Sequence, residues 1–231
     1  MTEDWENGGF GIYIHWPFCT AKCPYCDFNS HVRSNINQKQ WLKAYLNEIK
    51  RVSEKTSNRI LNSVFFGGGT PSLIEPSIIG DVLNEIQKHW KTKNNFEVTL
   101  EANPGSVDAK NFKAYKEAGV NRTSMGIQSL NTKDLKALGR THTVEEALAA
   151  FEIARQNFKA VSFDLIYARQ NQNISQWEKE LSLALSLEAS HMSLYQLTIE
   201  QGTAFGDRYN RGLLKGLPND DTSADMYDLT L

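Results

Sequence analysis

Three cysteines are the residues of this chain whose type and spacing point most directly to chemistry. Cys19, Cys23 and Cys26 fall within eight residues, and the rest of the 231-residue chain holds no other cysteine. An odd number of cysteines, in a chain without a secretory signal, does not indicate a disulfide framework. Thiolates select zinc ions or iron–sulfur clusters. The spacing therefore predicts a metal centre in this loop.

Two kinds of centre fit three clustered thiolates, and unliganded core cysteines are a third interpretation. A structural zinc ion needs four ligands in a closed tetrahedron, so His15, Asp27 or His31 would have to supply the fourth. A [4Fe–4S] cubane held by three thiolates keeps one iron open to a substrate or cofactor. The lack of a second cysteine pair favours the cubane.

A second candidate site is a run of three glycines, 67–69, followed by Thr70. Glycines let a ligand approach the backbone closely. Neither a Gly-Lys-Ser/Thr sequence nor Gly-x-Gly-x-x-Gly spacing is present, so phosphate binding is not indicated. Alone, such a turn could serve only tight packing. Next to the cysteine loop, it favours a cofactor site.

These motifs lie in a regular alternation of strand and helix patterns. Period-two alternation predicts strands at residues 11–15, 62–66, 96–101, 122–128, 160–166 and 191–197. Helical spacing predicts helices at 38–53, 76–90 and 108–118, and others that begin at 143, 175 and 220. Thr143 with Glu146, and Ser175 with Glu178, are expected to form capping boxes. Such alternation predicts an α/β fold with a parallel sheet and ligands at the carboxyl ends of its strands.

The phase of the strands separates an apolar from a polar face. Glu101, Gln128 and Asp164 fall late in their strands, on the face opposite residues such as Leu100 and Leu165. Strands of an open sheet with helices on both sides should be apolar on both faces. The pattern therefore predicts an open barrel with a polar interior. The helix that begins near 175 is expected to pack through Trp177, Leu181 and Leu185.

Composition excludes several classes of protein. Lys and Arg (25) nearly balance Asp and Glu (27), giving a net charge of −2, so the basic surface of a general nucleic-acid binder is absent. No apolar run reaches the roughly 18 residues of a membrane helix. The acidic start, Met1 to Glu6, has no apolar signal region. We expect a cytoplasmic protein.

Taken in order, the motifs resemble the radical S-adenosylmethionine (SAM) superfamily, and more narrowly its oxygen-independent coproporphyrinogen III oxidase group. The resemblance rests on residues 13–28, 67–72, 101–105, 124–129, 138–142 and 163–166, and covers the chain from Gly11 to Leu231. It implies a partial (β/α)6 barrel of parallel strands. Residues 1–10 would be a short N-terminal extension and 11–231 the barrel core, which would end inside its last helix, before the C-terminal domain of the family.

The resemblance also implies cofactors and their contacts. A [4Fe–4S] cluster would be bound by Cys19, Cys23 and Cys26, and its fourth iron would chelate SAM. One electron passed to the sulfonium would release methionine and a 5′-deoxyadenosyl radical. The residues implied to contact SAM are Tyr13, Tyr25, Gly68, Gly69, Thr70 and Glu101, with Gln128, Arg140 and Asp164 at a second SAM. The polar residues could instead be a solvated barrel lumen, and Arg140 an ordinary surface cation.

Two departures from the oxidase pattern point to a different branch of the group. Phe28 stands where the oxidases have a further cysteine, and only ten residues precede the first predicted strand. Both features, and the segment Tyr195 to Thr203, resemble the haem-chaperone branch. That resemblance implies haem binding, transfer of haem to acceptors such as respiratory enzymes, and an electron donor for the cluster. The alternatives are a radical SAM porphyrin enzyme, such as a coproporphyrinogen III oxidase, and a zinc-stabilised barrel.

The resemblance leaves the haem ligand, the oligomeric state and the acceptor open. A homodimer and a membrane-associated acceptor are both compatible with it, and the chain itself contains no predicted membrane segment. The candidate haem ligands are the histidines of the chain: His15, His31, His89, His142 and His191.

Overall fold

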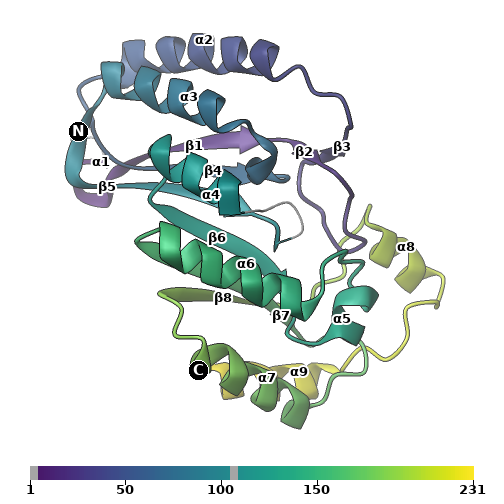
Figure 1. Cartoon of the computed structure of the whole chain (residues 1–231). Coiled ribbons are helices and arrows are strands. Elements are labelled where there is room, and N and C mark those ends of the chain that lie inside the picture. The colour runs from purple at the N-terminus through teal and green to yellow at the C-terminus, as the bar shows by residue number, and fades with distance from the viewer. Residues whose placement is uncertain (1–4, 105–108) are drawn as a thin grey trace.

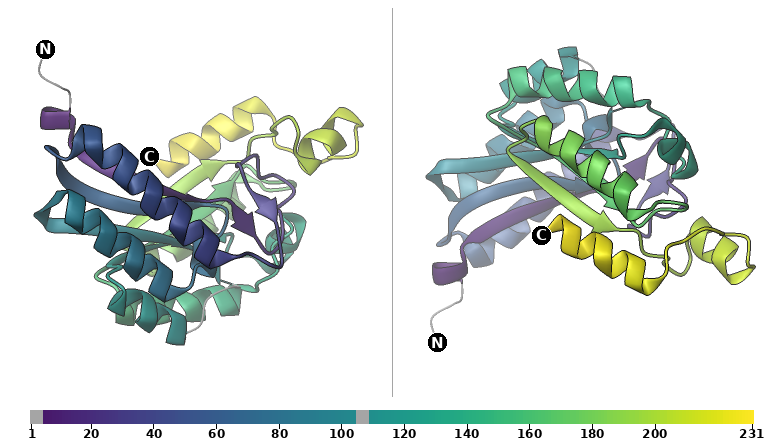
Figure 2. Two further views of the ribbon diagram at one scale, coloured as in Figure 1. Left: turned by 90° about the horizontal axis from the view of Figure 1, so that it is seen from above. Right: turned by 90° about the horizontal axis from the view of Figure 1, so that it is seen from below.

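In the computed structural model, which describes residues 5–104 and 109–231, six parallel strands form the main sheet. Their order across the sheet follows the chain: β1 (Phe10–Trp16), β4 (Ile60–Gly68), β5 (Lys91–Ala102), β6 (Arg122–Gln128), β7 (Ala160–Tyr167) and β8 (His191–Gln196). Within the described chain β1 and β8 are edges and do not pair. The sheet curves without closing (Figures 1 and 2). The predicted partial barrel is confirmed.

Helices between consecutive strands cover the outer face of the sheet, and further helices precede the first strand and follow the last (Figure 1). They are α1 (Trp5–Gly8), α2 (Gln38–Thr56), α3 (Pro76–His89), α4 (Ala109–Glu117), α5 (Thr132–Ala137), α6 (Val144–Asn157), α7 (Ile174–Ser186), α8 (Ala204–Asn210) and α9 (Asp220–Thr230), with a 3₁₀ turn η1 (Pro71–Leu73). Of the predicted helix 108–118, residue 108 lies outside the described residues. No helix in the described ranges is both long and apolar enough to span a bilayer.

The two faces of the sheet differ as the strand phase predicts. On the outer face, apolar side chains meet the helices, as where the Phe163 ring packs edge-on against Phe151 of α6 at 5.5 Å. On the inner face, Arg122 donates to Thr99 Oγ1 at 3.1 Å and to Ser162 Oγ at 3.0 Å. Because buried polar groups need partners, these strands pair their inward polar groups with one another. The barrel interior is polar.

Capping decides where two of the helices begin. The predicted box at Thr143 and Glu146 is present at the start of α6. The predicted box at Ser175 and Glu178 is wrong. The Asn173 side chain accepts from the Gln176 amide, and the Gln176 side chain accepts from the Asn173 amide, so α7 begins at Ile174. Asn is as good an N-cap as Ser, and Gln as good as Glu at the third position.

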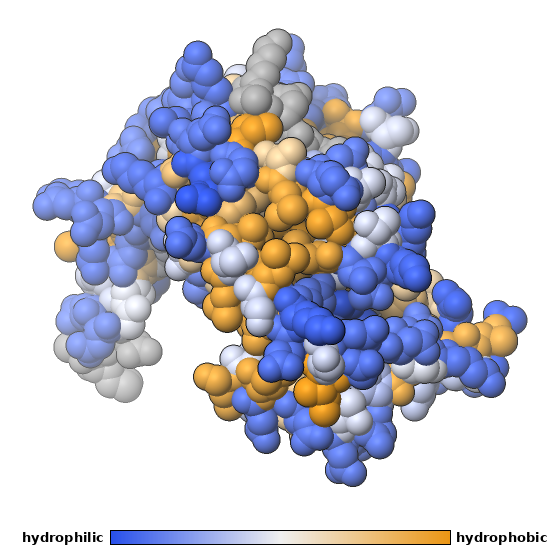
Figure 3. All heavy atoms as spheres, turned by 60° about the horizontal axis from the view of Figure 1, so that its bottom comes forward, coloured by the Kyte–Doolittle hydropathy of each residue, from blue (hydrophilic) through white to orange (hydrophobic). Residues whose placement is uncertain are grey.

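Of the three residues predicted to pack from α7, Trp177 is buried and Leu181 packs against the main core, but Leu185 does not. Trp177, Glu180 and Ala184 are buried, whereas Leu185 is 58% exposed. The buried stripe follows spacings of three and seven from Trp177, so Leu185, eight residues on, turns towards solvent. Figure 3, which views the side at the bottom of Figure 1, shows apolar side chains gathered in the middle of that surface.

Several short elements had no counterpart in the predicted pattern. Strands β2 (Phe18–Cys19) and β3 (His31–Val32) pair in parallel on either side of the cysteine loop. Helices α5 and α8 are six and seven residues long. These elements lie close to the carboxyl ends of the main strands (Figure 1).

Candidate cluster and cofactor site

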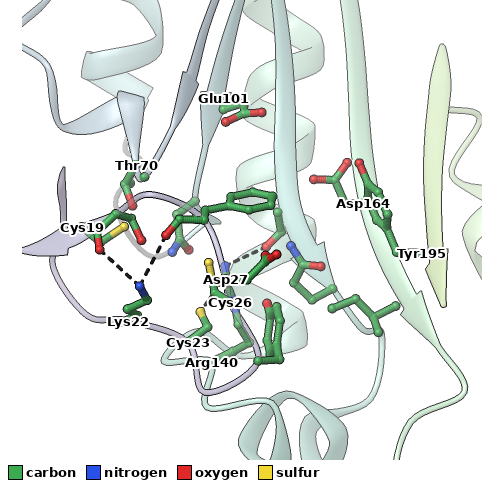
Figure 4. Close-up of a pocket in the computed structure, with 18 of the residues that line it drawn as sticks. Cys19, Lys22, Cys23, Cys26, Asp27, Thr70, Glu101, Arg140, Asp164 and Tyr195 are labelled. Carbon is green, nitrogen blue, oxygen red and sulfur yellow. Dashed lines mark hydrogen bonds between the residues drawn. The ribbon is translucent and has the colours of Figure 1, made fainter. Parts of the chain in front are cut away.

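The carboxyl ends of the strands surround one pocket, as expected for parallel strands. It is lined from the cysteine loop, the glycine turn and the ends of β5 to β8. Of the predicted site residues it includes Cys19, Cys23, Cys26, Tyr25, Gly68, Gly69, Thr70, Glu101, Gln128, Arg140 and Asp164. Figure 4 shows Asp164 and Tyr195 facing the pocket from the side opposite Cys19.

Tyr13 is the predicted site residue that the pocket lining leaves out. Its side chain is 56% exposed on the edge strand β1, and its ring stacks on Phe65 with centroids 6.0 Å apart. Burial and the nearby Glu101 carboxylate both raise the pKa of the Tyr13 hydroxyl. Tyr13 therefore faces the barrel interior near Glu101, but it lies next to the pocket and does not line it.

The cysteine loop is tied back on itself by backbone hydrogen bonds. The Cys26 amide donates to Cys23 O at 3.1 Å, and the His31 amide to Pro17 O at 2.7 Å. Lys22 Nζ donates to the carbonyl oxygens of Phe28 and Ser30, at 3.4 and 3.3 Å. The three thiols are free, with Cys19 buried and the others half-buried. The loop thus presents unpaired thiols to the pocket.

A guanidinium lies directly against one of these thiols. Arg140 Nη1 donates to Cys23 Sγ at 3.1 Å, and Nη2 donates to Gly126 O at 2.9 Å. Its Nε–H is buried without an acceptor among the described residues. Arg140 is therefore part of the pocket and not a surface cation. A fixed positive charge with a spare donor favours negative charge beside Cys23.

Burial raises the pKa of the Cys26 thiol, and the thiols of Cys23 and Cys19 add to this effect. The backbone amide of Phe28 and the charge of Lys22 partly offset it. A bound cation would reverse this balance, because metal coordination deprotonates thiols.

The glycine turn packs closely against the start of the cysteine loop. A Cβ on Gly69 would stand 2.6 Å from the carbonyl oxygen of Phe18, so only glycine fits there. Gly69 and Thr70 donate their amides to Trp16 O and Phe18 O, at 2.7 and 2.8 Å. These two amides are therefore already used, and close packing accounts for this part of the motif.

Gly68 has a different role from Gly69. Its φ of +119° is a conformation that other residues rarely adopt. In that conformation its amide donates to Glu101 Oε2 at 3.0 Å. The turn therefore fixes the position of the Glu101 carboxylate at the wall of the pocket.

Two carboxylates face the pocket from neighbouring parts of the sheet. Burial raises the pKa of Glu101 to about 7, although the Gly68 amide opposes the shift, and Asp164 adds to it. Burial raises the pKa of Asp164 to about 6, against the lowering effects of Ser193, Arg122 and Arg140. Such raised values are typical of binding and catalytic sites.

Gln128 ends β6 in a left-handed conformation, with φ of 73°. The pairing of β6 with β7 shifts register between Met125 and Gln128. His142 Nε2 donates to Ile127 O at 3.1 Å. Arg140 donates to the preceding carbonyl oxygen, Gly126 O. The loop after α5 therefore binds two successive carbonyls at the irregular end of β6.

The end of β8 was missed as part of the site. Tyr195, Gln196, Leu197, Thr198 and Glu200 line the pocket, although this segment was noted in the sequence only as a family resemblance. Alternation along β8 gave the available signal, because it places Ser193 and Tyr195 on the inner face with Asp164. Tyr195 is 55% exposed because β8 is an edge.

Comparison with known proteins settles the family. The model of the Radical SAM superfamily matches residues 13–184. The chain belongs to the radical SAM superfamily. Its fold resembles that of coproporphyrinogen III oxidase (HemN) from Escherichia coli, with a TM-score of 0.82 at 23% identity, over 95% of this chain and 51% of that one.

Curated relatives are considerably more similar in sequence. The chain is 41% identical to the heme chaperone HemW of Haemophilus influenzae over 94% of this chain and 57% of that protein. It is 39% identical to the mitochondrial radical S-adenosyl methionine domain-containing protein 1 of Danio rerio, over 94% and 49%. This radical SAM chain thus spans about half the length of the curated relatives it matches.

The residues at the pocket suit the cluster that the superfamily implies. Three thiols line one pocket, and a guanidinium with an unpartnered Nε–H lies beside Cys23. Both features suit a centre of soft sulfur ligation and net negative charge. Among the described residues, no three His, Cys, Asp or Glu side chains converge on a single metal ion. A cubane instead takes each thiolate on a separate iron.

None of the five histidines belongs to the pocket lining. His142 is buried, and His89 of α3 is held between Ser53 and Glu85. His15 Nε2 lies 3.0 Å from Asn29 O. His31 and His191 are exposed on short or edge strands. The histidines are thus spread over the radical SAM fold and not gathered at one site.

Proposed function

We propose that this chain is the radical SAM part of a haem chaperone. It would bind a [4Fe–4S] cluster, SAM and haem, and pass haem to acceptor haemoproteins. The observation that carries the proposal is the 41% identity to a protein named heme chaperone HemW across 94% of the chain. The pocket with its three thiols supports the cluster part of the proposal.

Within this function each side chain has a defined task. Cys19, Cys23 and Cys26 would ligate the cluster as thiolates, and Arg140 would balance their charge. Glu101 would face SAM, and Asp164 a second SAM, as hydrogen-bond acceptors when ionised. A cluster held by these thiolates would supply one-electron reducing chemistry at the SAM sulfonium. Gln128, Tyr25 and the carbonyl groups of the glycine turn complete the proposed SAM contacts, with Tyr13 at their edge.

The partners follow from the same proposal. They are haem, haem-acceptor proteins such as respiratory enzymes, and a one-electron donor to the cluster, in the cytoplasm. A membrane-associated acceptor and a homodimer are both consistent with it. The proposed domain division places residues 1–10 before the barrel core, and β1 begins at Phe10.

A second candidate function is oxidation of coproporphyrinogen III. The observation in its favour is the TM-score of 0.82 to HemN, which concerns the fold. Phe28 counts against it: where the oxidase pattern has a cysteine, this chain places a side chain that is 60% exposed at the rim of the pocket.

Anaerobic reconstitution separates the candidates. Iron and sulfide analysis should give four of each per chain, and a haem titration followed by visible spectroscopy should saturate. Reconstituted protein with SAM and a reductant should not convert coproporphyrinogen III. Robust turnover would favour the oxidase, and tight zinc binding without iron uptake would contradict both.

A further inference from the structure

A second, small apolar cluster lies beneath the cysteine loop, apart from the main core. Its buried members are Leu138, Ile166, Phe205 and Leu214, with Tyr25, Leu197, Ile199 and Leu217 packed against them. These residues come from α5, β7, α8 and the loops around them. The cluster thus joins the cysteine loop to the segment that follows β8.

Phe205 is the most buried member of this cluster and contacts the loop in two ways. Its side chain is 1% exposed, and its ring lies 6.3 Å from that of Tyr25. Its backbone amide donates to Pro24 O at 2.8 Å. Pro24 and Tyr25 are the two residues between Cys23 and Cys26. One helix residue therefore fixes the span between two thiols through both backbone and side chain.

The opposite side of the same span is also closely packed. A Cβ on Gly139, which has φ of +68°, would stand 2.6 Å from Pro24 Cδ. The next residue, Arg140, reaches Cys23 Sγ. The residues after α5 and the start of α8 thus pack against the Pro24–Tyr25 span from two sides.

The N-terminal turn of α8 is capped by hydrogen bonds of its own, which do not involve the cysteine loop. Thr203 Oγ1 accepts from the Gly206 amide at 3.0 Å and donates to Glu200 O at 2.7 Å. This cap closes the N-terminal turn of α8 on the segment that leaves the pocket lining at Glu200. The turn that carries Phe205 is therefore fixed by hydrogen bonds that do not involve the cysteine loop.

We propose that Phe205 is a positioning residue for the metal centre. By packing against Pro24 and Tyr25, helix α8 would set the distance between Cys23 and Cys26. The inference rests on the proposed cluster and extends it to residues outside the pocket. Groups behind metal ligands orient them, and changing such groups commonly costs 10–100-fold in affinity or activity. Because the contact is mutual, cluster binding should in turn stabilise α8.

The first test compares iron retention in variants of this chain. After anaerobic reconstitution, Phe205→Ala should release iron to a chelator about tenfold faster than the unmodified protein, and Phe205→Leu should fall between the two. The matched control is Phe112→Ala: Phe112 is fully buried in the main core against Phe158, with centroids 5.2 Å apart. It should lower thermal stability similarly without speeding iron release.

The second test needs no substitution and so does not depend on a variant folding. Amide hydrogen exchange is measured on the unmodified chain before and after loading with iron and sulfide. Exchange in α8, and at the Phe205 amide above all, should slow on loading, whereas exchange in α3 should not change.

Equal iron release from the Phe205 and Phe112 variants, or α8 exchange that loading leaves unchanged, would overturn the inference alone. An unmodified chain that takes up no iron would overturn the proposed function, and the inference with it. The two failures are therefore distinguishable.

Discussion

At the scale of single residues, each cysteine of the loop has a different environment but the same expected task. Cys19 is buried at the end of β2, whereas Cys23 contacts Arg140 and Cys26 closes the turn. Because three thiolates supply all the protein ligands of the proposed cluster, none can be replaced by a neighbour. This equivalence is a testable consequence of the proposal.

We therefore expect Cys19→Ala, Cys23→Ala and Cys26→Ala each to abolish the broad visible absorption of the reconstituted protein, because each leaves an iron without its soft anionic donor. Iron and sulfide analysis measures the effect. Asp27→Asn, a change in a non-cysteine residue of the same loop, is the control and should keep full loading. Four irons per chain in any of the three alanine variants would contradict the ligand assignment.

Arg140 should set the reduction potential of the cluster. Its Nη1 donates to Cys23 Sγ at 3.1 Å, and hydrogen bonds and positive charge near sulfur favour the more negative, reduced state. Arg140→Gln should lower the midpoint potential on the order of 50 mV, close to a tenfold change in a one-electron equilibrium constant. Arg140→Lys keeps the charge and should recover part of the shift. A redox titration followed by electron paramagnetic resonance that gave identical midpoints would contradict this role.

Glu101 makes stability depend on pH. Burial raises its pKa from an ordinary 4.5 to about 7 in the folded protein. Between these values the folded state holds a proton that the unfolded state has lost, so the free energy of unfolding falls as pH rises from 4.5 to 7. Glu101→Gln removes this loss and should be more stable than the parent by about 1–3 kcal/mol at pH 8.

Urea unfolding at about pH 4 and pH 8 checks the sign, because at the lower pH the two proteins should converge. Glu54→Gln on the exposed side of α2 is the control and should show no comparable difference. A Glu101→Gln variant that is less stable than the parent at pH 8 would contradict the burial argument.

At the scale of elements, a buried ion cluster joins α7 to the ends of β6 and β7. Arg169 Nη2 lies 2.7 Å from Asp134 Oδ2 and 2.5 Å from Glu180 Oε2. The other oxygen of Glu180 accepts from Ser129 Oγ and the Leu130 amide, both at 2.7 Å. The Glu180 carboxylate of α7 is therefore bonded both to Arg169, which follows β7, and to Ser129 and Leu130, which follow β6.

Replacing Glu180 leaves Arg169 paired with Asp134 alone and removes the acceptor of the buried Ser129 hydroxyl and of the Leu130 amide. Because a buried donor without an acceptor costs about 1–3 kcal/mol, Glu180→Leu should lower the free energy of unfolding by several such increments, measured by urea denaturation. Glu178→Leu, on the exposed side of the same helix, should cost far less. Equal effects of the Glu180 and Glu178 substitutions would show that the ion cluster contributes little.

Sequence patterns predicted these elements as far as their signals are local. Alternation along β5 and β7 placed Glu101 and Asp164 on the inner face, because strand phase depends only on neighbouring residues. The start of helix α7 was predicted too late because Asn173 with Gln176 and Ser175 with Glu178 are equally good capping pairs in sequence, and the structure uses the first. Helix α8 was missed since its seven residues carry no repeating apolar spacing.

At the scale of the whole molecule, the sequence predicted which residues meet but not how they are held. The order of the motifs placed Cys23 and Arg140 at one end of a barrel. The contact between Phe205 and Pro24 could not be predicted, because it joins segments far apart in the chain through a backbone amide. Likewise, the glycine run predicted close approach of a ligand to the backbone, whereas the amides of Gly69 and Thr70 donate to the carbonyl oxygens of Trp16 and Phe18.

The open edge of the sheet bears on haem affinity. Within the described chain β1 and β8 do not pair, and the inward-facing Tyr13 and Tyr195 are each more than half exposed. Sites that bind large apolar ligands tightly bury 70–90% of the ligand surface. A macrocycle that entered at this edge would keep much of its surface in water. The chain also spans about half the length of the curated relatives it matches.

We therefore expect the 231-residue chain to bind the cluster and SAM but to hold haem more weakly than the longer Haemophilus influenzae relative. The cluster and SAM contacts come from the ends of strands that are all present, whereas the edge that would cover a macrocycle is open. Side-by-side haem titrations of the two reconstituted proteins, followed at the haem absorption band, measure the difference. The relative truncated to the 57% of its length that aligns with this chain is the matched control and should weaken to the same degree. Equal affinities for all three proteins would instead place the whole haem site within residues 1–231, on the barrel itself.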